Sequence, residues 1–360
     1  MKRVGILTGG GDAPGLNAVI RAAVKTAINQ YSCDVFGVRN GYDGFLEESG
    51  VIPLELKDVR GILPRGGTIL GAANRGNPYA RKIIRDGREV TIDVSDEIVK
   101  GIERLKLDAL LVLGGDGTLH IAHELYQKGV PVIGVPKTID NDIGGTDVTF
   151  GFDTALSIAT EALDRLHTTA ESHHRVMVLE LMGRDAGFIT LHSGVAGGAD
   201  VILIPEIPFK FDAVVAKVRQ RVERGMLFSI IAISEGAKPL GGMQVFSRGG
   251  DEVYVPRLGG IGHALGEYIE KSGFETRVTV LGHLQRGGTP TPFDRWLATR
   301  YGAAAVRLAA DGKFDHMVAL ISGRIIEISL EEALAVPKRV DVNGDAVLTA
   351  RNIGISFGDE

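Results

Sequence analysis

Short apolar runs alternate along the chain with longer amphipathic stretches, and glycine-rich or polar loops separate them. Short continuous apolar runs are typical of buried parallel strands, whereas apolar residues spaced three or four apart are typical of helices. We predict strands at Val4–Leu7, Val35–Val38, Asp108–Leu113, Val130–Val135, Val176–Leu181, Val201–Ile204, Phe228–Ile233, Val278–Leu281 and Val318–Ile321. We predict helices at about residues 16–30, 95–105, 118–128, 153–171, 187–196, 213–224, 261–271, 295–310 and 330–335, with Ser95 as a helix N-cap.

Repeated strand–helix alternation predicts an α/β fold with mostly parallel sheets and helices on both faces. We expect two Rossmann-like domains, with the active site in the cleft between them. The first would comprise residues 1–151 plus about 285–335, and the second 152–284 plus about 336–360.

Composition narrows the class of protein. A length of 360 residues fits about two domains, and a net charge of -5 gives no reason to expect nucleic-acid binding. The N-terminal apolar run is too short for a secretory signal, and no stretch approaches the roughly 18 apolar residues of a membrane helix. With Cys33 as the only cysteine, no intrachain disulfide can form. We therefore expect a cytoplasmic protein without membrane or nucleic-acid partners.

Polar chemistry gathers where three predicted strands end. Thr8–Gly15 is a glycine-rich loop, Gly114–Thr118 reads GGDGT, and Pro136–Asp142 reads PKTIDND. Loops at the carboxyl ends of parallel strands commonly bind phosphate and metal ions. The first loop matches neither usual phosphate-binding pattern, so by itself it fits a tight turn equally well. Arg75, in another glycine-rich loop, fits either a phosphate ligand or a surface arginine.

Six motifs, in order, resemble those of the 6-phosphofructokinases. They are TGGGDAPGLNAVIR from Thr8, GGTILG from Gly66, GGDGT, PKTIDND, MGR at residues 182–184, and LGHLQRGG from Leu281. The resemblance covers roughly Lys2 to Ala335. GGDGT also occurs in NAD kinases and diacylglycerol kinases, but PKTIDND and GHLQRGG have no role there. The series PKTIDND, MGR and GHLQRGG is the specific signal.

The resemblance implies a glycolytic reaction in which a terminal phosphoryl group moves to the 1-hydroxyl of fructose 6-phosphate, giving fructose 1,6-bisphosphate, with Mg²⁺. Asp140 matches the general base, with Thr138 and Asp142 as supporting neighbours. Arg184 would neutralise charge in the transition state. Without the motif, these carboxylates would be read as an acidic turn. The residues matched to the donor site are Gly11, Arg75, Gly115, Asp116, Gly117, Thr118 and Lys137, with Asp116 also serving the metal.

The resemblance also implies an acceptor site and an oligomer. Met182, Gly183, Arg184 and Glu235 would bind the sugar, along with Thr138 and Asp140. The 6-phosphate would meet Arg175, Arg277, His283 and Arg286, because arginine offers paired donors to phosphate oxygens. In the family, the counterparts of Arg175 and Arg277 come from an adjacent subunit, which implies a homo-oligomer, usually a tetramer. In isolation each arginine would be read as a surface residue and the histidine as a structural one.

Two positions bear on the phosphoryl donor, and they point in different directions. In the family that the chain resembles, a glycine at the position of Gly117 is typical of ATP users, whereas a lysine at the position of Lys137 is typical of pyrophosphate users. A carboxylate at 117 would block and repel an α-phosphate, while a lysine at 137 can pair with a phosphate of either donor. We therefore expect ATP, with pyrophosphate as the alternative. A non-catalytic sugar-phosphate-binding regulatory subunit is the alternative from another functional class.

An effector site is implied only in part. Arg21, Lys25, Asp200 and Arg224 match the family's cationic effector pocket, whereas Leu56 and His167 stand where arginines are expected. We therefore expect an altered effector response. The paired histidines 173/174 and 120/123 lack zinc-type spacing and are interpreted as structural.

Overall fold

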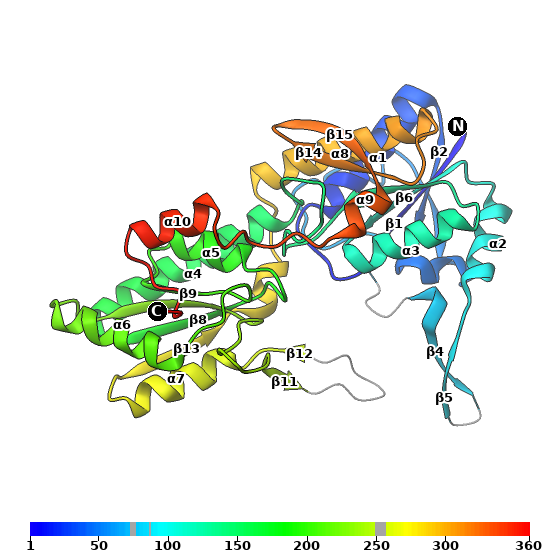
Figure 1. Ribbon diagram of the computed structural model, residues 1–360. Helices are drawn as coiled ribbons and strands as arrows, with labels where there is room; N and C mark the ends of the chain where they lie inside the picture. Colours follow the sequence, from blue (N-terminus) through cyan, green and yellow to red (C-terminus); the bar gives the residue numbers. More distant parts are fainter. Residues whose placement is uncertain (73–76, 86–87, 249–256) are drawn as a thin grey trace. The chain divides into compact units, whose positions relative to one another are not determined.

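The computed structural model describes residues 1–72, 77–85, 88–248 and 257–360, which form two compact units (Figure 1). Unit 1 comprises residues 1–138, 142–153 and 286–337. Unit 2 comprises residues 139–141, 154–285 and 338–360. The chain thus enters unit 2 three times, first for only three residues inside the PKTIDND motif.

Unit 1 is built on a seven-stranded sheet with the order β15-β14-β7-β6-β1-β2-β3. The five central strands pair in parallel, and the two edge strands are antiparallel to their neighbours. The strands are β1 (Arg3–Thr8), β2 (Asp34–Val38), β3 (Val51–Leu54), β6 (Ala109–Gly114), β7 (Val132–Pro136), β14 (His316–Ile321) and β15 (Arg324–Ser329).

Helices cover both faces of this sheet, which is why its central strands are apolar throughout. On β6, Leu111 belongs to the core beneath α1 (Leu16–Tyr31) and α8 (Pro292–Ala310). Its neighbour Leu110 belongs to the core on the other face. The second core is covered by α2 (Ser95–Leu105), α3 (Asp116–Gln127) and α9 (Leu330–Ala335).

The predicted N-cap of α2 is wrong. Ser95 is the first helical residue, and the N-cap position is Val94, without a side-chain cap. The Asp93 carboxylate accepts hydrogen bonds from the Ser95 backbone N–H at 2.8 Å and from its hydroxyl at 2.6 Å. The side chain of Asp93, two residues before Ser95, is therefore the hydrogen-bond acceptor at the start of this helix, in place of the predicted serine hydroxyl.

Unit 2 has a four-stranded parallel sheet with the order β13-β8-β10-β9. Its strands are β8 (Val176–Leu181), β9 (Val201–Leu203), β10 (Ser229–Ser234) and β13 (Thr276–Val280). One face packs against α6 (Phe211–Glu223) and α7 (Ile261–Lys271). α5 (Phe188–Ala196) packs against β9 and β10 and is contacted by α10 (Asp345–Asn352); α4 (Phe152–His173) precedes β8. The predicted α/β fold is confirmed.

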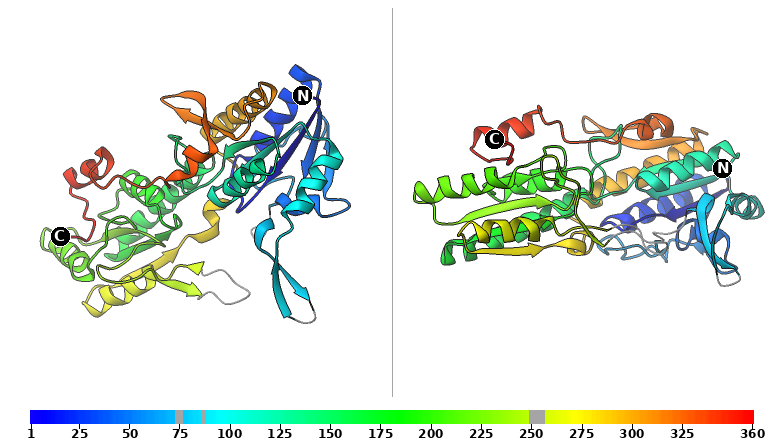
Figure 2. Two further views of the ribbon diagram at one scale, coloured as in Figure 1. Left: turned by 45° about the vertical axis from the view of Figure 1, so that its right-hand side comes forward. Right: turned by 60° about the horizontal axis from the view of Figure 1, so that its bottom comes forward.

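Several elements lacked a readable hydrophobic pattern. They are β3, β15, α10, the pair β4 (Arg81–Arg85) and β5 (Arg88–Ile92), the pair β11 (Phe246–Arg248) and β12 (Arg257–Leu258), and the 3₁₀ turns Gly41–Phe45, Pro78–Ala80 and Gly282–Arg286. β4 and β5 are exposed or half-buried throughout their described residues, so burial imposes little alternation on them. Figure 2 shows these two strands as a projecting ribbon. No helix in the described ranges is long and apolar enough to cross a membrane.

Candidate active site

In unit 1, three loops emerge together at the carboxyl ends of β1, β6 and β7. These strands are parallel neighbours, with β6 in the middle. The backbone N–H of Gly9 donates to the carbonyl of Leu113 at 2.9 Å, and that of Lys137 donates to the carbonyl of Gly114 at 3.0 Å. The pairing therefore continues past the strand ends and holds the three loops in contact.

Glycine residues, which have no side chain, allow the first two loops to approach this closely. A Cβ on Gly9 would lie 2.5 Å from Cγ2 of Thr118, and one on Gly114 would overlap the same side chain. Thr118 is 8% exposed, and its carbonyl accepts a hydrogen bond from the Tyr42 hydroxyl at 3.0 Å. Glycine at positions 9 and 114 therefore lets Thr118 pack between the first two loops.

Two cations lie beside the first loop. Lys137 is 3% exposed, and its Nζ donates to the carbonyl of Gly11. Arg286 donates through Nη1 to the carbonyl of Asp12 at 3.3 Å, and a Cβ on Gly11 would lie 3.0 Å from the same nitrogen. A glycine-rich loop with one buried and one half-buried cation is a suitable environment for phosphate oxygens.

Asp116 is the first residue of α3, and its side chain is 54% exposed. Its Oδ1 lies 3.3 Å from Nδ1 of His120, one helical turn later. An accessible carboxylate beside a loop suited to phosphate fits Mg²⁺, which prefers oxygen ligands and keeps several waters. The described residues contain no cluster of three or more His, Cys, Asp or Glu side chains that could hold a metal alone.

The position next to Asp116 is open. A Cβ on Gly117 would meet no atom within 4 Å.

The PKTIDND motif is divided between the two units. Thr138 ends a segment of unit 1, and its carbonyl accepts from the Thr149 hydroxyl at 2.8 Å. Asp140 belongs to unit 2 and is 5% exposed. Asp142 returns to unit 1 and is half-buried.

In unit 2, Glu235 lies beside the MGR loop. Its backbone N–H donates to the carbonyl of Leu181 at 2.7 Å, which joins the ends of β10 and β8. Burial, followed by the nearby negative charge of Asp140, raises the pKa of Glu235 to about 7. Hydrogen bonds from the backbone N–H groups of Gly183 and Arg184 act in the opposite direction. Glu235 can therefore change its charge near neutral pH.

The MGR loop has an uncommon backbone. Arg184 has φ 47°, a left-handed conformation that non-glycine residues rarely adopt, and its side chain is exposed. Gly183 has φ 150°. A Cβ on Gly236 would overlap the carbonyl oxygen of Arg184. Glycine after Glu235 is thus required for the two loops to touch.

Two buried side chains near this loop were not assigned from the sequence. Gln285 is fully buried, and its Oε1 accepts from the Met182 backbone N–H at 2.8 Å. Glu180 is 2% exposed and accepts from the backbone N–H groups of Gly260 at 3.1 Å and Gly262 at 2.8 Å. Gln285 lies inside the LGHLQRGG motif, and Glu180 interrupts an apolar strand. A single uncharged glutamine, or a single glutamate within an apolar strand, is not enough to predict a structural role from the sequence.

The four residues predicted to meet the 6-phosphate are divided. Arg175 and Arg277 share one partner, Glu275, whose Oε1 lies 2.7 Å from Nε of Arg175 and 2.9 Å from Nη2 of Arg277. His283 is exposed in the turn Gly282–Arg286 of unit 2, whereas Arg286 belongs to unit 1. Arg75 lies outside the described residues.

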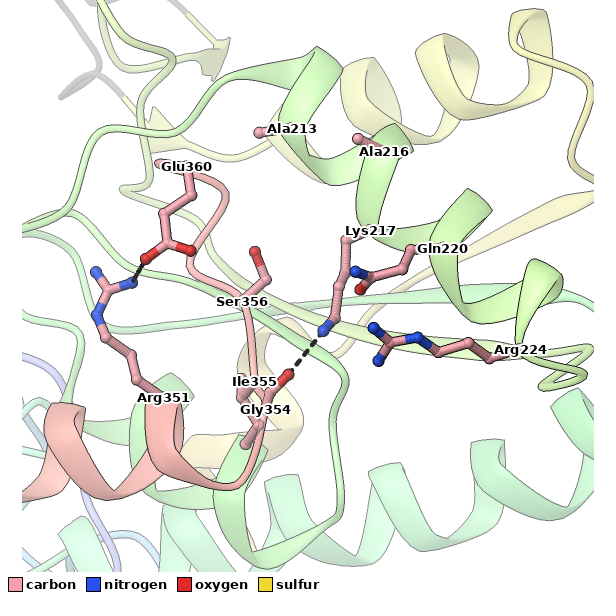
Figure 3. A pocket seen from close by; sticks show the side chains of 10 residues that line it. All are labelled: Ala213, Ala216, Lys217, Gln220, Arg224, Arg351, Gly354, Ile355, Ser356 and Glu360. Carbon is pink, nitrogen blue, oxygen red and sulfur yellow. Dashed lines mark hydrogen bonds and ion pairs between the residues drawn. The ribbon is translucent and has the colours of Figure 1, made fainter.

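Arg224, one of the matched effector residues, lines a pocket of about 470 Å³ in unit 2 (Figure 3). The pocket lies between α6 and the last ten residues of the chain. Lys217 points across it and donates to the Gly354 carbonyl at 2.8 Å. Arg351 pairs with Asp359 at 2.5 Å and with Glu360 at 3.3 Å. Since two of its three cations already have protein partners, the pocket is a poor anion site as it stands.

The other effector matches are spread over both units. Arg21 and Lys25 lie on α1 of unit 1, whereas Asp200 lies in unit 2 and forms an ion pair with Arg221 at 2.7 Å. His167, which replaces an expected arginine, packs edge-on against Phe228 with ring centroids 5.1 Å apart. The altered effector response stays a prediction.

Comparison with known proteins gives a consistent assignment. A sequence model described as phosphofructokinase matches residues 3–309. The chain is 55% identical to a protein of Chloroflexus aurantiacus named ATP-dependent 6-phosphofructokinase, over 100% of this chain and 98% of that one. It is 52% identical to a pyrophosphate--fructose 6-phosphate 1-phosphotransferase of Streptomyces coelicolor, over 99% and 100% of the two chains. The structure of Pichia pastoris phosphofructokinase in the T-state superposes with a TM-score of 0.80 at 31% identity, covering 93% of this chain and 35% of that longer chain.

Proposed function

This chain belongs to the phosphofructokinase family, and from that membership we propose that it is a cytoplasmic glycolytic kinase. It would transfer the terminal phosphoryl group of ATP to the 1-hydroxyl of fructose 6-phosphate. Unit 1 supplies the groups that bind the donor, and unit 2 supplies most of those that bind the sugar.

In unit 1, the loops at Gly10–Asp12 and Gly115–Gly117 would offer backbone N–H groups to the donor phosphates, because the Gly9 N–H is already bonded to Leu113. Lys137 and Arg286 add positive charge beside the first loop. Asp116 would hold Mg²⁺, which when bound neutralises charge on the phosphates. Phosphoryl transfer depends mainly on such positioning and charge neutralisation, and these residues are of the required types.

In unit 2, Asp140 takes the proton of the sugar hydroxyl as that oxygen attacks phosphorus. A carboxylate that is 5% exposed is well suited to this task, because few water molecules compete for it. Glu235 accepts hydrogen bonds from sugar hydroxyls. The exposed guanidinium of Arg184 neutralises charge that develops on the transferred group.

The open space around Gly117 is the observation that favours ATP over pyrophosphate as the donor. No atom lies within 4 Å of the position that a Cβ would occupy there. The remainder of a nucleotide needs open space beyond the β-phosphate, and an aspartate would both fill that space and repel the phosphates. Lys137 and the similarity to pyrophosphate-dependent enzymes keep pyrophosphate as the alternative donor.

The test is phosphorylation of fructose 6-phosphate with Mg-ATP and with pyrophosphate, measured side by side in the wild type and in Gly117→Asp. We expect wild-type turnover with ATP and a loss of at least about 10-fold in kcat/KM for ATP in the variant, the effect of one desolvated like-charge contact. Gln127→Glu adds the same charge at the other end of α3 and serves as the control. Wild-type turnover with pyrophosphate alone would overturn the choice of ATP.

The proposal includes a homotetramer whose subunits complete one another's sites. Arg175 and Arg277 would serve a neighbouring subunit, and their shared partner Glu275 is half exposed, so both guanidinium groups can exchange it for a phosphate. Mixing an inactive Asp140→Asn enzyme with an inactive Arg277→Ala enzyme, followed by subunit exchange, should then restore part of the activity. Sedimentation of the wild type as a monomer, or mixtures without recovered activity, would contradict shared sites.

A further inference from the structure

The segment Lys338–Val340 begins the last entry of the chain into unit 2. It lies beyond residues 3–309, which the family match covers. Nζ of Lys338 donates to Oδ1 of Asn141 at 3.1 Å and lies 5.3 Å from the ring centroid of Phe188. Nη1 of Arg339 donates to the carbonyl of Asp185. Two consecutive cations therefore bind two loops that are far apart in the sequence.

The third residue of the segment adds an indirect link to the second loop. The backbone N–H of Val340 donates to Oε1 of Glu206 at 3.0 Å. The same carboxylate accepts from the backbone N–H of Gly187, at 3.0 and 3.1 Å from its two oxygens. Glu206 thus joins Val340 to the loop that begins with MGR.

The bound loops carry the proposed catalytic groups. Asn141 directly follows Asp140, and Asp185 directly follows Arg184. Asn141 has φ 55° and Arg184 has φ 47°, so each loop contains a non-glycine residue in the left-handed region. Such conformations persist where surrounding contacts hold them, and they concentrate at functional sites. Asn141 is 4% exposed and Lys338 is half-buried, so their hydrogen bond is partly shielded from water.

We propose that Lys338 and Arg339 are positioning residues, which hold the Asp140 and Arg184 loops in their catalytic conformations. This inference rests on the function proposed above. Neither cation would touch the reacting atoms. Each acts through the residue that follows a proposed catalytic group. A hydrogen bond from a charged donor is stronger than one between neutral groups, so it can stabilise the conformation of that loop.

The first test compares Lys338→Met with Lys217→Met. Methionine keeps an apolar stem against Phe188 and removes the charged donor. Lys217 is the matched control, because it also joins unit 2 to the end of the chain, through Gly354, but contacts none of the proposed catalytic loops. We expect kcat to fall roughly 10-fold in Lys338→Met, as for the loss of one charged hydrogen bond, with less than a twofold change in Lys217→Met. Lys338→Arg should recover most of the loss.

A double-mutant cycle separates positioning from general stabilisation. Glycine adopts φ near 55° without strain, so Asn141→Gly should make the Asp140 loop independent of Lys338. In that background, Lys338→Met should lower kcat by less than twofold. Equal losses from Lys338→Met in both backgrounds would overturn the proposal, as would equal effects of Lys338→Met and Lys217→Met on kcat.

Hydrogen exchange provides a readout that does not require turnover. Lys338→Met should speed amide exchange at residues 139–142, and Arg339→Met should do so at residues 183–187, each by roughly 10-fold. Lys217→Met should leave both segments unchanged. If the wild type phosphorylates fructose 6-phosphate with neither donor, the proposed function fails while the exchange result still decides whether these cations hold the loops. Unchanged exchange in both variants would overturn the positioning role.

Discussion

In unit 1, glycine residues let the loops after β1, β6 and β7 lie close together. The side chain of Thr118 packs against Gly9 and Gly114, between the first two loops. In unit 2, the loops after β8 and β10 meet through the carboxylate of Glu235, with the backbone of Arg184 pressed against Gly236. The first arrangement leaves loops with few side chains, in which backbone N–H groups can approach a ligand. The second brings two acidic side chains, Asp140 and Glu235, close together, one buried and one half-buried.

This difference follows from what each set of residues would have to bind. Phosphates are large anions that are well matched by N–H groups and cations, so the proposed donor site of unit 1 would need open space as well as positive charge. A sugar hydroxyl must lose a proton, so unit 2 needs a carboxylate whose environment is controlled. Unit 2 should therefore be more sensitive to small changes in charge and shape than unit 1.

The largest expected effect is that of Asp140→Asn. It removes the proposed base but keeps the size of the side chain, so kcat should fall by about 10²–10⁴-fold. Binding of fructose 6-phosphate, measured by calorimetry, should change little. Asp142→Asn, in unit 1, should lower kcat far less. Similar losses in the two variants would break the division of tasks between the units.

A smaller effect is expected from adding one methyl group at Gly236. Gly236→Ala forces Cβ against the carbonyl of Arg184, which should cost about 1–3 kcal/mol of unfolding free energy. Gly117→Ala places Cβ in open space and should be neutral or slightly stabilising, because alanine favours the first turn of α3. Chemical denaturation measures both. Equal destabilisation would show that the loops of unit 1 are as tightly packed as those of unit 2.

The last effect depends on pH and concerns the pKa of Glu235. Because this pKa is raised from 4.5 to about 7, the folded protein retains a proton that the unfolded chain has lost, and stability falls as pH rises between these values. Glu235→Gln should remove that loss, and above pH 7 it should gain up to about 3 kcal/mol relative to the wild type, with no gain below pH 4.5. Thermal unfolding from pH 4 to 8 measures the difference. A constant offset at every pH would show that Glu235 titrates normally.

The hydrophobic pattern alone was enough for the architecture. The apolar run Ala109–Gly114 and the mostly apolar run Val176–Leu181 are buried on both faces, and their agreement with the predicted strands reflects that burial. The pattern could not reveal β4, β5 or β15, because exposed strands carry no regular apolar face. It also misplaced the cap of α2, since Asp93 and Ser95 offer similar acceptors and only the backbone path selects between them.

For the site, the sequence by itself determined which residue types are available and in what order: the glycine-rich loops, Asp116, Asp140, Arg184 and Glu235. Such motifs are readable because each is a short run whose chemistry depends on neighbouring residues. The sequence did not reveal that Gln285 holds Met182, or that Lys338 and Arg339 bind the loops of Asn141 and Asp185. Those contacts join residues separated by 103, 197 and 154 positions. Only the tertiary structure decides them, because a hydrogen bond depends on distance and direction in space.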